Sequence, residues 1–111
     1  MAKEVLVDSQ QNTLVDTPER FFTAPSGGGD NGVEITAFTA TNNTTSNVTY
    51  IAYIYRLGVP EEAIVPLKIL VRDSYDLAPA AVGQKLNPGD ELWIESSAVP
   101  SAIFNVTGNS L

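Results

Sequence analysis

The chain has no cysteine and no histidine. Without cysteine there is no disulfide and no thiolate nucleophile, and without histidine the commonest general base and a frequent zinc ligand are missing. Catalysis would have to rest on carboxylates alone, and neighbouring ones such as Asp73 and Asp76 fall in or beside turns. We therefore predict that the protein is not an enzyme and holds no cofactor and no metal ion.

Basic residues and long apolar runs are also scarce, which limits the partners. Six lysine and arginine residues face thirteen acidic ones, a formal charge of −7, whereas a nucleic-acid groove needs basic side chains to replace the phosphate counterions. No segment approaches transmembrane length, and the three apolar residues Val5, Leu6 and Val7 are far shorter than a signal-peptide core. We expect a protein made and kept in the cytoplasm that binds neither nucleic acid nor membranes.

What the chain does contain favours strands. Its 111 residues suit one domain, since single cores commonly run about 100 to 150 residues. Threonine, asparagine and serine supply much of the polarity, and turn signals recur at short intervals. Pro79 limits the one stretch that could form a helix to about one turn. The sequence predicts a single all-β domain, a β-sandwich of eight or nine short strands with jelly-roll-like or Greek-key topology.

Three parts can be distinguished within this single domain of residues 1–111. Residues 1–24 are expected to form short N-terminal strands or an arm, and the pattern leaves this choice open. Residues 25–32 form a glycine-rich loop, which is not a phosphate loop because no Lys-Ser or Lys-Thr follows the glycines and Val33 opens a strand. Residues 33–111 are expected to form the main sandwich.

The central segment, residues 33–57, reads as two long strands joined by an Asn/Thr-rich turn. The apolar parity of the first strand changes near Ala37, which predicts a bulge or a crossing between sheets there. In the second strand Tyr53 and Tyr55 lie on the side opposite to Tyr50, so both faces are apolar. One face can pack on the core, and the other then lies in a sandwich interior or meets a partner protein.

The last third of the chain is the most regular. The sequence Asn87-Pro88-Gly89-Asp90 predicts a turn in which proline fixes φ at the second position and glycine supplies a positive φ at the third. In the next strand Trp93 points outward, either as a contact anchor or beneath another loop of the same domain. A last strand over residues 102–107 is expected to end at Gly108.

Several stretches between Gly32 and Leu111 carry a family resemblance. They are the glycine-rich entry, ITAFTATNNT, TYIAYIY, LNPGDELW and the closing IFNVTGNSL. From Gly32 to Leu111 the chain resembles small virion proteins of tailed phages, and is most similar to the capsid decoration or "staple" proteins of short-tailed phages of the epsilon-fifteen type. The resemblance implies a jelly-roll-like sandwich on the outer capsid surface of the virion, where pairs of copies clamp neighbouring major capsid subunits.

Two functional hypotheses therefore compete. In the first, the protein is a capsid-stabilising structural protein that binds the major capsid protein and is a homo-oligomer, with a dimer favoured. In the alternative, it is a carbohydrate-binding module of a phage tail or head surface that uses Tyr53, Tyr55 or Trp93 as sugar platforms. The candidate partner-contact residues are Val5, Leu6, Val7, Tyr53, Tyr55 and Trp93.

Overall fold

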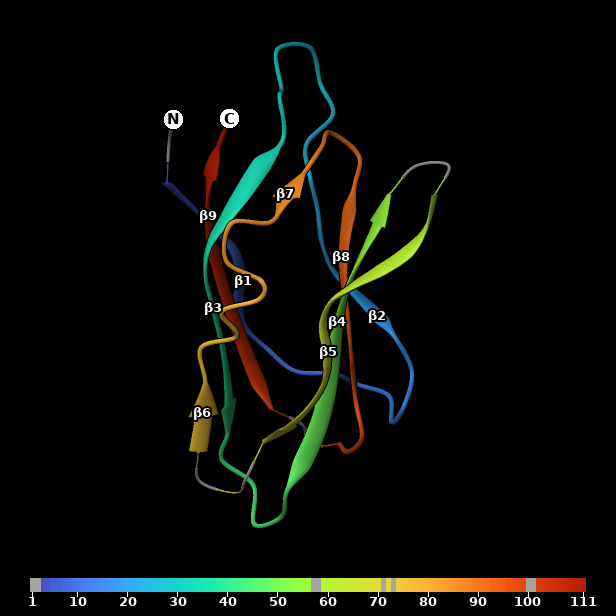
Figure 1. The fold of residues 1–111 in the computed structure, drawn as a ribbon, viewed down its shortest axis with the longest axis vertical. Coiled ribbons are helices and arrows are strands. Elements are labelled where there is room, and N and C mark those ends of the chain that lie inside the picture. Colours follow the sequence, from blue (N-terminus) through green and yellow to red (C-terminus); the bar gives the residue numbers. More distant parts are fainter. Residues whose placement is uncertain (1–2, 57–58, 71, 73, 100–101) are drawn as a thin grey trace.

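A computed structural model describes residues 3–56, 59–70, 72, 74–99 and 102–111, and within them nine strands form two antiparallel sheets (Figure 1). Sheet I has the order β1-β9-β3-β6, with β7 also paired to β3; its strands are β1 (Lys3–Gln10), β9 (Ile103–Ser110), β3 (Val33–Asn42), β6 (Ser74–Asp76) and β7 (Lys85–Leu86). Sheet II has the order β2-β8-β4-β5; its strands are β2 (Glu19–Thr23), β8 (Glu91–Ser96), β4 (Val48–Arg56) and β5 (Val59–Leu70). None of the described residues forms a helix long and apolar enough to cross a membrane.

The pairing order identifies the topology. Apart from the two-residue β7, the first strand pairs with the last (β1 with β9), the second with the last but one (β2 with β8), then β3 with β6 and β4 with β5. This nesting of antiparallel pairs across two sheets is that of a jelly roll, which contains two Greek keys. The predicted all-β sandwich is confirmed, and strands β1 and β2 are integral to it.

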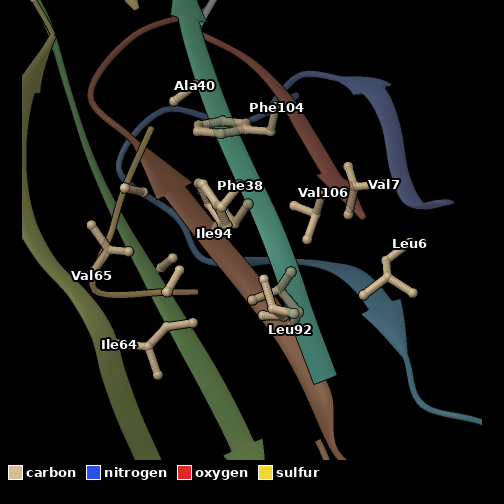
Figure 2. Close-up of a cluster of buried hydrophobic side chains, with 14 of the residues drawn as sticks. Leu6, Val7, Phe38, Ala40, Ile64, Val65, Leu92, Ile94, Phe104 and Val106 are labelled. Carbon is tan, nitrogen blue, oxygen red and sulfur yellow. The ribbon is translucent and has the colours of Figure 1, made fainter. Parts of the chain in front are cut away.

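The core lies between the two sheets and follows the two-residue period of the strands. On β8, Leu92 and Ile94 are buried, and on β9, Phe104 and Val106 are buried. Figure 2 shows these side chains in one cluster with Phe38 of β3, the strand next to β9 in sheet I. Because strands from both sheets contribute, one continuous core holds the chain together as a single unit.

Strand β1 resolves the choice that the sequence left open for the N-terminus. It pairs with β9 as the edge strand of sheet I, so it is a strand and not an arm. Leu6 and Val7 are buried in the core (Figure 2). Only Val5 of the three apolar residues points away from the core, with 67% of its surface exposed. The strand is therefore part of the folded sandwich and of its core.

Two local predictions for β3 and the proline turn are confirmed. The register of β3 against β9 shifts between Ile35 and Ala37, which is the predicted bulge. In the turn before β8, Gly89 has φ of 88° and the Asp90 N–H donates to the Asn87 carbonyl over 2.9 Å. The Asp90 carboxylate also accepts a hydrogen bond from Arg56 Nη1 at 2.8 Å, so this turn is tied to the end of β4.

The expected end of the last strand at Gly108 is wrong, since β9 continues to Ser110. Gly108 pairs with Glu4 on one side and with Ile35 on the other. A Cβ atom at this position would come within 2.5 Å of the Glu34 carbonyl oxygen. Glycine here permits a close approach of two backbones inside the sheet and does not stop the strand.

The connection between β1 and β2 is held by the carboxylate of Glu19. It accepts hydrogen bonds from the Thr13 hydroxyl, from the Thr13 and Leu14 backbone N–H groups, and from the Asn12 side-chain amide. Partial burial by itself raises the pKa of Glu19, but these hydrogen bonds outweigh it and hold the pKa below its ordinary value. The charged form of Glu19 is thus the form that stabilises this connection.

Acid should weaken the connection. A carboxyl whose pKa is lower in the folded than in the unfolded chain adds stability above its unfolded pKa, near 4.5, and this stability is lost as the pH falls through the folded pKa. We expect Glu19→Gln to lower the melting temperature at neutral pH, with the difference between variant and wild type closing as the pH falls below the ordinary glutamate pKa of 4.5. Thr13→Val, which removes one donor, should give a smaller difference of the same sign. Melting curves of wild type and both variants from neutral to acidic pH test this expectation. A difference in melting temperature that does not change with pH would contradict it.

Candidate functional site

Three of the predicted contact residues come together on the outer face of sheet II. Tyr53 of β4 stands directly across from Trp93 of β8, and Tyr55 is the next residue on the same side of β4. Antiparallel partners point their side chains to the same face, so the three rings share the face turned away from the core. All three side chains are partly exposed. We call Tyr53, Tyr55 and Trp93 the aromatic face.

The rings of the aromatic face pack on one another. The centroids of Tyr55 and Trp93 are 4.6 Å apart with planes 21° from parallel, a stacked pair. Those of Tyr53 and Tyr55 are 6.3 Å apart at 86°, an edge-to-face pair. Both geometries are favourable for aromatic rings. The surface is thus assembled by the protein itself, and a partner would not have to order these side chains on binding.

Two carboxylates flank the aromatic face. Glu91 accepts a hydrogen bond from the Trp93 indole N–H at 2.9 Å, and its other oxygen pairs with Arg20 Nη1 at 3.3 Å. Glu95 accepts a hydrogen bond from the Tyr53 hydroxyl. The indole N–H and this hydroxyl are therefore both directed at carboxylates, which fixes the orientation of the rings.

A small pocket adjoins the aromatic face and shares Glu95 with it. We call it the acidic pocket; its volume is about 150 Å³ and it is lined by Asp16, Thr49, Tyr50, Ile51, Glu95, Ser96 and Ser97. Ile51 stands across from Glu95 in the β4–β8 pair, so the pocket continues the same face of sheet II. Asp16 adopts a left-handed φ of 51°, and its N–H donates to the Ser96 carbonyl over 2.8 Å. That bond brings the loop before β2 to the pocket.

Size and chemistry limit what this pocket could hold. Small-molecule sites commonly span roughly 300 to 1,000 Å³, so a volume of about 150 Å³ suits one side chain or a few waters. Among the described residues no group of three or more acidic side chains is arranged to hold a metal ion. A pocket of this size therefore suits the recognition of a single side chain.

The remaining predicted contact residues do not join this site. Val5 is exposed, but it lies on β1 at the edge of sheet I, on the other layer of the sandwich. Leu6 and Val7 belong to the core. Glu91 and Glu95 stand two residues before and two residues after Trp93 in the sequence, but the prediction for Trp93 gave these two carboxylates no role. Asp16 carried no sequence signal, since only the tertiary fold brings its loop to sheet II.

The sheet edges are less suited to recognition than the aromatic face. The register of β1 shifts on both sides of Val7, and β5 contains Pro60 and Pro66 with several register shifts against β4. Strand β6 has only three residues. Short, irregular and proline-containing edges are those on which strands add poorly. Recognition is therefore expected to use side chains more than backbone pairing.

No protein-family model, curated protein or solved structure matches the chain. The aromatic face and the acidic pocket are therefore the features that bear on function.

Proposed function

We propose that this protein is a structural component of a virion that decorates the outer capsid surface and clamps neighbouring major capsid subunits, so that the DNA-filled shell is stabilised. The observation that carries the proposal is the aromatic face. Its three rings lie on the outer side of sheet II, apart from the core cluster between the sheets, and aromatic residues are enriched at the centres of protein interfaces.

Two further features support the same function. The resemblance over Gly32–Leu111 is to capsid decoration proteins, and the jelly roll is an architecture of viral capsid and lectin domains, although a fold by itself does not fix a function. The clamp itself works by linkage. A protein that binds the assembled shell but not separated subunits stabilises the assembled state, by about 2.7 kcal/mol per site at a concentration one hundred times Kd.

Particles that lack the protein test this proposal. We expect them to assemble but to release DNA at a lower temperature than complete particles, because internal pressure then acts on unclamped subunit boundaries. Adding back the purified protein should restore heat resistance. Adding back Trp93→Ala should not, although this variant should fold, since Trp93 lies outside the core cluster. Equal heat resistance with and without the protein would contradict a clamping role.

The aromatic face also favours one second function, a carbohydrate-binding module of the phage tail or head surface. Sugar C–H groups can pack on aromatic rings while hydroxyls donate to carboxylates, and Glu91 and Glu95 lie beside Tyr53 and Trp93. Binding of the purified protein to a glycan array, lost in Trp93→Ala, would favour this function. A map of the particle separates the two, since the first requires density over capsid subunit boundaries.

A further inference from the structure

The hydrogen bonds of the aromatic face leave it rich in acceptors. The indole N–H of Trp93 and the hydroxyl of Tyr53 already donate to Glu91 and Glu95. An ionised carboxylate has about four acceptor positions in total, so both retain capacity for further donors. The faces of the aromatic rings are also negative in potential. This surface therefore favours a partner that brings positive charge and several N–H donors.

The charge distribution strengthens this preference toward the acidic pocket. Arg20 pairs with Glu91 at one end of the face. At the other end, no lysine or arginine of the described residues pairs with Glu95 or Asp16, and none lines the pocket. The whole chain carries a formal charge of −7, which adds a long-range attraction for basic partners. Among the residues that the structure describes, no positive charge thus faces Asp16 and Glu95, which both line this pocket.

The shape of the site selects one kind of cation. A pocket of about 150 Å³ accepts a side chain, and Ile51 in its wall gives an apolar contact for the methylene groups of a long stem. Lysine would place a strongly hydrated point charge there. Arginine has a planar, more weakly hydrated group that binds carboxylates through paired N–H donors and stacks on aromatic rings.

We propose that the acidic pocket and the aromatic face together bind an arginine side chain of a partner protein. Its guanidinium group enters between Asp16 and Glu95, its stem packs against Ile51, and the adjoining part of the partner covers Trp93. The inference rests on the proposed function for the partner's identity, the major capsid protein. The binding chemistry itself can be tested without any capsid.

The probes are three short peptides, acetyl-Gly-Xaa-Gly-amide with arginine, lysine or citrulline at the central position. Citrulline has nearly the shape of arginine but no charge. The indole N–H signal of Trp93 reports binding, because the chain has a single tryptophan. We expect the arginine peptide to shift this signal at millimolar concentration, with affinity about tenfold above that of the citrulline peptide and falling with added salt. Equal affinity for the arginine and citrulline peptides would overturn the inference.

Matched variants locate the site. Glu95→Gln and Asp16→Asn should each weaken arginine-peptide binding by about tenfold, since each removes one carboxylate from the pocket. Glu34→Gln removes an acidic residue from β3 of sheet I and should leave the affinity unchanged. Melting temperatures confirm that the variants fold. Equal losses in all three variants would mean that net charge, not the pocket, attracts the peptide, and this would overturn the inference.

The same variants distinguish this inference from the proposed function. If shells bind wild-type protein and Glu95→Gln equally well, decoration stands and the arginine site is wrong. If arginine peptides bind as expected but particles gain no heat resistance, the arginine site stands and the clamp is wrong. If neutral oligosaccharides shift the Trp93 signal and none of the peptides does, the site binds carbohydrate and the inference is overturned.

Discussion

Gly32→Ala is expected to destabilise the protein by about 3 kcal/mol or more, a large part of the roughly 5–15 kcal/mol that holds a domain folded. Two physical causes add. Gly32 has φ of 94°, a conformation that L side chains rarely adopt, and a Cβ atom there would lie 2.2 Å from the Leu86 carbonyl oxygen of β7. The Gly32 carbonyl also accepts the Leu111 N–H at 3.0 Å, so a backbone shift would disturb the C-terminal end as well.

Three other glycines separate the two causes. Gly28 has neither a positive φ nor a close neighbour, so Gly28→Ala should change stability by less than about 0.5 kcal/mol. Gly29 has φ of 90° but open space around it, and its alanine variant should lose about 1–2 kcal/mol. Gly108 lacks the positive φ but lies against the Glu34 carbonyl, so Gly108→Ala tests the steric cause alone. Urea unfolding measures all four, and a Gly32 variant no weaker than the Gly29 variant would contradict the close contact.

Phe104→Ala is expected to cost about 3–5 kcal/mol, because it opens a cavity in the centre of the core. Phe104 of β9 is 0% exposed. Its ring centroid lies 5.3 Å from Tyr50 and 5.6 Å from Phe21 across the sandwich, and 6.2 Å from Phe38 within its own sheet. Truncation therefore removes contacts between the two layers. Its neighbour Tyr50 is fixed by a 2.9 Å hydrogen bond from its hydroxyl to Asp76, and burial with that bond raises the pKa of Tyr50.

Calorimetric melting of matched variants checks this expectation. Phe104→Leu keeps most of the buried volume and should lose clearly less than Phe104→Ala. Trp93→Ala removes a larger ring from the aromatic face, yet should lose clearly less than Phe104→Ala, because Trp93 is only partly buried and lies outside the core. A Trp93 variant as unstable as Phe104→Ala would show that the aromatic face serves folding and not recognition.

Local features of the chain were predictable where the backbone preferences of a few consecutive residues determine the structure. The turn at Asn87–Asp90 follows from the fixed φ of proline and the tolerance of Gly89 for positive φ. The bulge near Ala37 follows from a change of parity along one strand. The prediction for Gly108 is wrong because the sequence shows a glycine but not the neighbouring Glu34 carbonyl, which leaves no room for a side chain there. Close backbone contacts across a sheet leave no local signal.

By itself, the sequence determined an all-β chain with alternating strands, a glycine-rich loop, Tyr53 and Tyr55 on the side of their strand opposite to Tyr50, and Trp93 pointing outward from its strand. The two-residue period suffices for this, because it assigns each side chain to a face without knowledge of the partner strand. Only the tertiary structure decided the jelly-roll pairing, the burial of Leu6 and Val7, and the meeting of Asp16 with Glu95 in one pocket. These depend on contacts between residues far apart in the chain, and such contacts are fixed by the packing of two whole sheets around a shared core.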